Sequence, residues 1–140
     1  MLRVNEVFSS FSVNDADAAL RFYGQTLGLS IQKVAGMPNP GILELLPVPG
    51  RLILIYSKAD HQPATYTVLN LAVADIDEAA ADLRQKGVVF EQYDHPAYGT
   101  DEQGICRPRG PEPDIAWFKD PAGNLLSIMQ QQSAAERNPT

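Results

Sequence analysis

Two segments of the chain alternate apolar and polar residues, and each is followed by apolar residues at helical spacing. In the strand predicted over residues 4–13, Phe11 and Val13 share the apolar face. Leu71 and Val73 do the same in the second segment. A period of two is typical of a strand with one buried face, and a spacing of three to four residues is typical of a helix packed on it. The pattern therefore predicts two pairs of strand and helix.

The two predicted helices begin and end with the same kinds of residue. Asn14 or Asp15 is expected to cap the first helix and Asp75 the second, because a side-chain oxygen there binds free N–H groups of the first turn. Gly28 and Gly87 stand where a left-handed residue ends a helix. Capping explains the aspartates at the helix starts better than a role as catalytic carboxylates.

The order of strand, cap and helix recurs along the chain. The residues that follow Val13 return after Val73, sixty positions later (73 minus 13). Further strands are predicted behind the helices, over residues 30–35, 41–46 and 51–57 in the first half and 88–93, 114–119 and 124–130 in the second. Each half is then a βαβββ unit, so the chain contains one small unit twice. A duplicated unit predicts a site at the junction of its copies.

Two connections in the second half carry further information. Asp120, Pro121 and Gly123 fit a tight hairpin between the last two strands, because proline presets the first turn residue and glycine accepts a positive φ. Residues 93–114 form the longest irregular stretch and hold the richest cluster of reactive side chains. A loop of this length inside a compact domain usually folds over something or is mobile. We expect it to act as a lid.

The length of the chain limits how the two halves can fold. With 140 residues the chain is one ordinary domain, whereas a single half would be marginal alone. The halves are therefore expected to share a core or to pair with those of a partner chain. The predicted organisation is one domain over residues 1–132, with modules at about 4–58 and 66–130, a linker around 59–64 and a flexible tail over 133–140.

Charge and cysteine content exclude several classes of protein. The net charge of −6 and the pI near 4.7 give no basic surface for phosphate groups, which argues against nucleic acid and anionic membranes as partners. Cys106 is the one cysteine, so an internal disulfide framework and a multi-cysteine zinc site are excluded. The chain has neither an apolar run near the ~20 residues of a spanning helix nor a visible secretory signal. A cytoplasmic location follows as the default expectation.

Two motifs give the most specific indication of the fold. They are Val13-x-Asp15-x-Asp17-x-Ala19-x-x-Phe22-Tyr23-x-x-x-Leu27-Gly28-Leu29 and Ala116-Trp117-Phe118-Lys119-Asp120-Pro121-x-Gly123-Asn124. With these motifs and its repeat, the chain resembles the vicinal oxygen chelate superfamily from about Asn5 to Met129. That family includes glyoxalase I, extradiol dioxygenases and bleomycin-resistance proteins. The resemblance implies an α+β fold in which two βαβββ modules form a curved mixed sheet with an open trough, usually in a homodimer.

The resemblance also implies where a metal site would lie. In the enzymes of that family, four strand positions facing the trough carry His, Glu or Gln and bind a divalent metal. Here the corresponding residues are Phe8, Leu54, Val68 and Ser127. Phe, Leu and Val offer no lone pair, and a single serine hydroxyl is a poor donor to a divalent ion. We therefore expect no metal and no cofactor, and a binding protein rather than an enzyme.

Two alternative functions stay open. One is a metal-dependent lyase or dioxygenase of the glyoxalase type that uses other ligands, such as Glu44 with His95. The other is a structural or interaction protein with a filled trough. Cys106 and His95 could also form a nucleophile and its base, but no pattern fixes their distance. His61, in the linker, is expected to be a surface residue, and no catalytic residue is predicted.

Two arginines in the long loop admit two interpretations. Arg107 and Arg109 could hold an anionic group through bidentate contacts. The simpler expectation is that they pair with the acidic residues nearby in the sequence, namely Asp101, Glu102 or Glu112.

The main prediction is a trough that binds a small organic molecule, aromatic or amphipathic. Ser10 and Asn70, which are equivalent across the repeat, favour an open trough because burying them without a partner would be costly. Aromatic and apolar walls with a few hydrogen-bonding groups are typical of small-molecule pockets. The predicted ligand-binding residues are Phe8, Ser10, Leu54, Tyr56, Asn70, Tyr98, Cys106, Arg107, Trp117 and Ser127.

Overall fold

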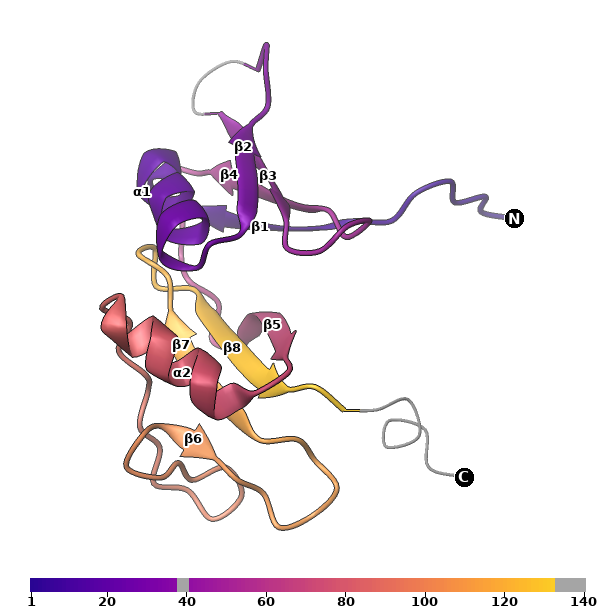
Figure 1. Cartoon of the computed structure of the whole chain (residues 1–140). Coiled ribbons are helices and arrows are strands. Elements are labelled where there is room, and N and C mark those ends of the chain that lie inside the picture. The colour runs from indigo at the N-terminus through magenta and orange to yellow at the C-terminus, as the bar shows by residue number, and fades with distance from the viewer. Residues whose placement is uncertain (38–40, 133–140) are drawn as a thin grey trace. The chain divides into compact units, whose positions relative to one another are not determined.

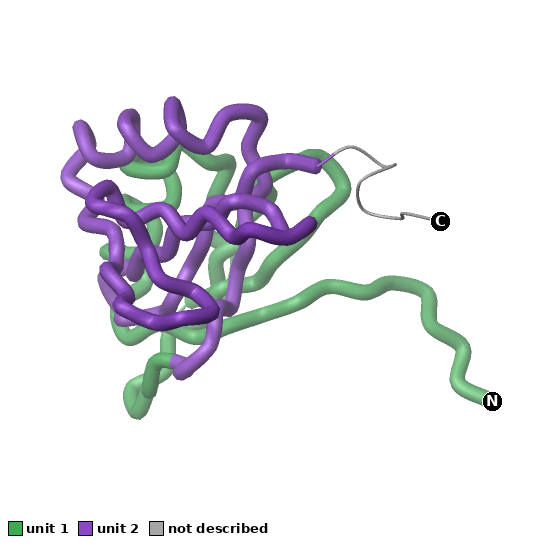
Figure 2. The backbone as a smooth tube through the Cα atoms, turned by 90° about the horizontal axis from the view of Figure 1, so that it is seen from below, with its two compact units in different colours: residues 1–63 green, residues 64–140 purple. Residues whose placement is uncertain are grey.

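The computed structural model describes residues 1–37 and 41–132, so the tail predicted over residues 133–140 lies outside the described part. The chain divides into two compact units, Met1–Pro63 and Ala64–Thr140 (Figure 2). Each unit has its own four-stranded mixed sheet and its own helix. The elements of each unit follow the order β, α, β, β, β, which confirms the predicted α+β fold with two βαβββ modules.

The first unit is built around a sheet with the strand order β1-β4-β3-β2. Its elements are β1 (Ser9–Val13), α1 (Ala16–Arg21), a π-helical turn η1 (Phe22–Thr26), β2 (Ser30–Lys33), β3 (Ile42–Leu46) and β4 (Ile53–Ser57) (Figure 1). Strands β1 and β4 are parallel, and the other pairs are antiparallel. Helix α1 contacts β3 and β4, and the core residues Val13, Leu43, Leu45 and Ile55 are buried.

The second unit repeats this plan with the strand order β5-β8-β7-β6. Its elements are β5 (Thr67–Val73), α2 (Ile76–Gln85), β6 (Ile105–Cys106), β7 (Ile115–Lys119) and β8 (Leu125–Gln130) (Figure 1). Helix α2 contacts β8. The core combines buried residues of the helix with buried residues of the sheet, namely Ile76, Ala80, Leu83, Ile105, Ala116, Phe118, Leu126 and Ile128.

The helix caps confirm the repeat at the level of backbone geometry. Asp15 caps α1 with φ −141°, and Asp75 caps α2 with φ −142°. The Asp15 carboxylate accepts from the Ala18 N–H at 3.1 Å, and that of Asp75 accepts from the Glu78 N–H, also at 3.1 Å. Of the two candidates for the first cap, Asp15 is therefore the capping residue.

Both glycines predicted to end a helix adopt a left-handed conformation, but only the first helix passes through a π-helical turn before its glycine. Gly28 and Gly87 have φ values of 71° and 92°. In the first unit the helix widens after Arg21 into the π-helical turn η1, which the pattern does not predict. This turn carries the fully buried Tyr23, whose ring lies 5.3 Å from that of Phe22.

The predicted hairpin at residues 120–124 is confirmed. The Asp120 carboxylate is buried and accepts from the backbone N–H groups of Ala122 and Asn124, each at 2.9 Å. It also accepts from the side-chain amide of Asn124 at 3.0 Å. Gly123 has a φ of 85° and donates its N–H to the carbonyl of Asp120. These bonds hold β7 and β8 in register.

Two predicted strands need correction. The strand predicted over residues 4–13 begins only at Ser9, because Ser9 pairs with Ile53, the first residue of β4, and no strand within residues 1–37 and 41–132 pairs with the residues before Ser9. Residues 88–93 form no strand. Only Phe90 bridges to Phe118, because the chain then closes a loop in which the Tyr93 N–H binds Thr100 Oγ1 at 2.8 Å.

The position of the missing strand is filled by β6. Ile105 pairs with Ala116 and Cys106 with Ile115, on the edge of β7 that Phe90 also touches. Two short segments thus share the edge that one strand was expected to occupy. Residues 91–104, between Phe90 and β6, do not belong to the sheet, and some of them form a wall of a pocket.

Candidate functional site

The sheet of the second unit carries a pocket of about 860 Å³. Its floor is formed by Cys106 on β6, Ile115 and Trp117 on β7, and Met129 on β8. Cys106 lies opposite Ile115, and Ile115 lies opposite Met129, so these side chains share one face. The residues that alternate with them are buried in the core, so the pocket lies on the sheet face opposite that core.

Two segments of the long loop form the walls. They comprise residues 95–99 and residues 107–113 except Pro111, and both belong to the stretch that we expect to act as a lid. The pocket is lined by His95, Pro96, Ala97, Tyr98, Gly99, Cys106, Arg107, Pro108, Arg109, Gly110, Glu112, Pro113, Ile115, Trp117 and Met129. The loop therefore covers part of the sheet face within its own unit.

Aromatic rings dominate one side of this pocket. The rings of Tyr98 and Trp117 lie 6.4 Å apart at 76°, and Tyr93 packs edge-on against Trp117 at 5.3 Å. His95 stacks on Tyr98 with the ring centroids 3.7 Å apart. The Ala97 N–H donates to His95 Nδ1 at 3.0 Å, which places the proton of the neutral ring on Nε2. The aromatic wall is thus braced by the loop backbone.

Burial and neighbouring charge perturb the groups around this wall. The pKa of Tyr93 is raised, first by burial and then by the negative charge of Glu91. The pKa of Cys106 is raised above its ordinary value by burial and by the nearby Asp114 carboxylate. Cys106 is also only 5% exposed. It is therefore held as a neutral thiol, which argues against the nucleophile that the sequence left open.

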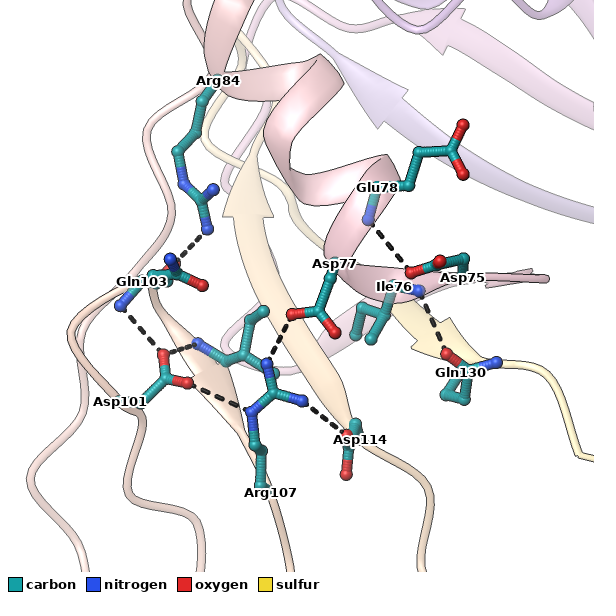
Figure 3. A network of polar contacts seen from close by, with 11 residues as sticks. Asp75, Ile76, Asp77, Glu78, Arg84, Asp101, Gln103, Arg107, Asp114 and Gln130 are labelled. Carbon is teal, nitrogen blue, oxygen red and sulfur yellow. Dashed lines mark hydrogen bonds and ion pairs between the residues drawn. The ribbon is translucent and has the colours of Figure 1, made fainter.

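Arg107 is engaged by three carboxylates (Figure 3). Its Nη2 donates to Asp77 Oδ1 at 2.6 Å, its Nη1 to Asp114 Oδ2 at 2.9 Å, and its Nε to Asp101 Oδ2 at 3.2 Å. These partners, Asp77 above all, raise the pKa of the guanidinium. The pairing with Asp101 was expected from the sequence, whereas the pairs with Asp77 and Asp114 were not.

The neighbouring Arg109 differs from Arg107 in its ion pairing. Arg109 also lines the pocket, and within residues 1–37 and 41–132 it makes no ion pair. Of the two arginines, Arg107 therefore follows the interpretation of pairing with acidic neighbours, although its atoms still form part of the pocket wall.

Two of the predicted ligand-binding residues, Ser127 and Asn70, form a hydrogen bond with each other. Ser127 on β8 is fully buried and donates to Asn70 Oδ1 at 2.6 Å. Ser127 also lies opposite Trp117, so Asn70, Ser127 and Trp117 stand in one row across the sheet. Ser10 and Asn70 are both exposed, so the argument from costly burial does not apply to them. The buried polar group is Ser127, and Asn70 satisfies it.

The remaining predicted residues belong to the first unit. Ser10 pairs with Leu54 in the register of β1 and β4, and Ser12 pairs with Tyr56, so these side chains share the sheet face opposite the core. Phe8 lies just before β1 and is 48% exposed. The trough predicted from the resemblance, which would combine these residues with those of the second unit, stays a prediction.

The linker histidine has a partner that the sequence did not indicate. His61 is half-buried, and its Nδ1 lies 2.6 Å from the hydroxyl of Ser12. No motif surrounds either residue, so only the folded unit reveals the contact. The expected surface position of His61 is compatible with its partial burial, and the bond to Ser12 adds a contact that the sequence did not indicate.

The donor set does not fit a divalent metal. The four positions implied by the resemblance carry Phe8, Leu54, Val68 and Ser127. In the part of the chain that the structure describes, no three His, Cys, Asp or Glu side chains gather as metal ligands. Of the alternative ligands, Glu44 accepts a hydrogen bond from Gln32, at 3.2 Å. We derive no chemistry that passes through a metal.

Sequence reasoning missed several pocket residues, two of which could have been found. Ile115 and Met129 follow from the alternation of the strands predicted over residues 114–119 and 124–130, which places them on the face of Trp117 and Ser127. The loop residues Pro96, Ala97 and Pro113 carry no such signal. Their positions depend on how the long loop folds back on the sheet.

Comparisons with known proteins agree with this fold. A family model described as "Glyoxalase/Bleomycin resistance protein/Dioxygenase superfamily" matches residues 3–128. A solved structure of a member of that superfamily from Sphaerobacter thermophilus DSM 20745 is 27% identical, with a TM-score of 0.66, and covers 93% of this chain and 100% of that chain. No curated protein sequence matches the chain.

Two further solved structures share the fold at lower identity. TnmS3, an antibiotic binding protein from Streptomyces sp. CB03234, is 21% identical with a TM-score of 0.60, covering 94% of this chain and 100% of that chain. FosX, a fosfomycin resistance protein from Listeria monocytogenes, is 16% identical with a TM-score of 0.69, covering 97% of each chain. In the described residues no helix is long and apolar enough to cross a membrane. The chain belongs to the Glyoxalase/Bleomycin resistance protein/Dioxygenase superfamily.

Proposed function

We propose that the protein binds a small, mainly apolar organic molecule in the pocket beside Trp117, without the help of a metal ion. The observation that carries this proposal is the pocket itself, with its volume of about 860 Å³ and its aromatic wall. Small-molecule sites are typically clefts of roughly 300–1,000 Å³ lined by apolar and aromatic side chains. Trp117 and Tyr98 offer ring faces and edges against which a planar molecule can pack.

The chemistry of the lining supports binding more than catalysis. The floor consists of Ile115, Trp117, Met129 and the neutral thiol of Cys106. Arg107 is engaged by carboxylates of its own chain. Neither the Cys106 thiol nor the Arg107 guanidinium is poised to transfer a proton or to attack a substrate near neutral pH. An apolar floor with a polar rim instead favours holding a molecule away from water.

The relatives are compatible with such a role. TnmS3 is named as an antibiotic binding protein, and FosX is named for fosfomycin resistance. Binding that keeps a small molecule away from its target is one activity that this fold can host. The resemblance also implies a homodimer, which we retain as part of the proposal.

A fluorescence titration tests the proposed pocket. Trp117 is the one tryptophan of the chain, so its emission reports directly on the site. We expect the neutral dye Nile red to quench Trp117 and to bind with saturation. Tyr98→Ala should weaken the affinity about tenfold, because it removes a ring of the pocket wall.

Tyr66→Ala is the matched control, because Tyr66 is 69% exposed and lies outside the pocket lining. It should leave the affinity of the dye within about twofold of the original. Equal loss of affinity in both variants, or no saturable quenching of Trp117, would refute the proposed site.

A further inference from the structure

We infer that Arg107 acts as a positioning residue for the pocket wall, and that the affinity of the pocket is set in part by Asp77, a residue of helix α2 outside the pocket lining. This inference rests on the proposed function, since it concerns the same site. It assigns to Arg107 a structural role in binding, whereas the sequence analysis placed this residue both among the predicted ligand-binding residues and in a pairing with acidic neighbours.

Arg107 occupies the point at which the wall leaves the sheet. It follows Cys106, the last residue of β6, and opens the segment over residues 107–113. Its three carboxylate partners come from three places, as Figure 3 shows: Asp77 from α2, Asp101 from the turn before β6, and Asp114 from the residue before β7. The Arg107 guanidinium, at the start of the wall segment, therefore binds Asp114, which directly follows the end of that segment.

The turn before β6 is itself fixed. Asp101 Oδ1 accepts from the N–H groups of Gln103 and Ile105 at 2.9 and 3.0 Å, and the Asp101 N–H donates to the carbonyl of Ile105. Burial tends to raise the pKa of Asp101, but these bonds and Arg107 outweigh it and lower the pKa. Asp101 is therefore a charged, ordered partner for the guanidinium.

Helix α2 holds the same turn at a second point. Arg84 Nη2 donates to the carbonyl of Gln103 at 2.8 Å, and its guanidinium lies 5.4 Å from the centre of the Phe90 ring. Asp77 and Arg84 thus join one side of α2 to the segment that carries Arg107. The helix is packed on the core, so it supplies a rigid support for the wall segment that begins at Arg107.

Asp77 is the partner best suited to test this coupling. Its contact with Arg107 is the shortest of the three, at 2.6 Å, and it links residues 30 positions apart. The pair is partly exposed, with 41% and 59% of the two side chains accessible, so salt should weaken it. Changing Asp77 disturbs the support of the wall without altering any residue that lines the pocket.

The experiment compares Asp77→Ala with Glu78→Ala. Both remove one acidic side chain from the first turn of α2, so both lose a similar interaction with the helix dipole. Only Asp77 binds Arg107. The readouts are the affinity for Nile red, measured by Trp117 quenching, and the backbone ¹⁵N order parameters of Arg107 and Arg109.

We expect Asp77→Ala to weaken Nile red binding about threefold to tenfold and to lower the order parameters of the wall, with Glu78→Ala within about twofold of the original protein. Raising the salt to about 0.5 M should reduce the difference between Asp77→Ala and the original protein, because salt screens the same ion pair. The dye is neutral, so a direct effect of the lost charge on the ligand is avoided.

The two proposals fail in different ways. If Nile red does not bind the original protein, the proposed function fails, while the order parameters still decide the role of Arg107. If Asp77→Ala and Glu78→Ala have equal effects on the wall and on binding, the positioning role is overturned.

Discussion

Trp117 and Cys106 line the same pocket, but the sequence predicts their positions to different extents. Trp117 alternates with the buried Ala116 and Phe118 on β7, so a strand with a period of two places its side chain on the face opposite the core once the burial of these two neighbours is known. Cys106 lies on a strand of two residues within a long loop, and so short a strand has no period to recognise. Its place opposite Ile115 becomes visible only in the folded unit.

The partners of Arg107 also show which contacts can be predicted from the sequence and which cannot. Asp101 is close in sequence, and its pairing could be expected from that alone. Asp77 is 30 residues away and meets Arg107 because α2 packs beside the loop, which no local pattern encodes. Side chains whose contacts are local can be predicted from the sequence, whereas those brought together by tertiary packing cannot.

At the scale of single residues, Cys106 should be a slow nucleophile. Its pKa is raised by burial and by Asp114, so the reactive thiolate is a smaller fraction at any given pH than for an ordinary thiol. We expect the rate of alkylation by iodoacetamide at neutral pH to be at least about tenfold below that of the unfolded protein. The rate should rise only at a pH above the range of a free cysteine.

Nile red should slow this alkylation further, because Cys106 lies in the pocket floor. The reaction is followed by mass spectrometry of the intact protein, with the urea-unfolded chain as the reference. A thiol that reacts as quickly in the folded as in the unfolded protein contradicts the burial of Cys106.

Among the elements, both helix caps form as predicted, whereas the second strand predicted for the second module does not form. The caps at Asp15 and Asp75 are local features, and both form as their residue types predict. The strand predicted over residues 88–93 fails because the edge of β7 is shared between Phe90 and β6. That choice depends on pairing between residues far apart, which apolar content alone does not decide.

Loss of a cap should lower the stability of the second unit by a modest amount. Asp75→Ala removes the acceptor for the Glu78 N–H, and we expect a loss of about 1 kcal/mol in the free energy of unfolding. Urea denaturation followed by Trp117 fluorescence measures it, because that residue lies in the same unit. Gln85→Ala, at the exposed end of the same helix, is the control and should cost nothing measurable. An unchanged midpoint for Asp75→Ala would show that the cap bond contributes nothing.

For the whole molecule, the repeat and the motifs lead to the correct superfamily. The family model confirms the fold, whereas the absence of a metal from this chain's site stays a prediction based on the residues at the four implied positions. The side chains of Phe8, Leu54 and Val68 have no atom that could bind a metal, and the Ser127 hydroxyl donates a hydrogen bond to Asn70 Oδ1. The pocket beside Trp117 is therefore the site on which the proposed function rests. Dimerisation stays a prediction.

The most direct test of the account is the affinity of the protein for Nile red with and without metal. Protein treated with EDTA and dialysed is titrated with the dye, with Trp117 quenching as the signal, and the titration is repeated in excess Mn²⁺ or Zn²⁺. We predict saturable binding in each case, with dissociation constants that agree within about twofold. Binding that disappears with EDTA and returns with a metal ion would contradict a metal-independent pocket.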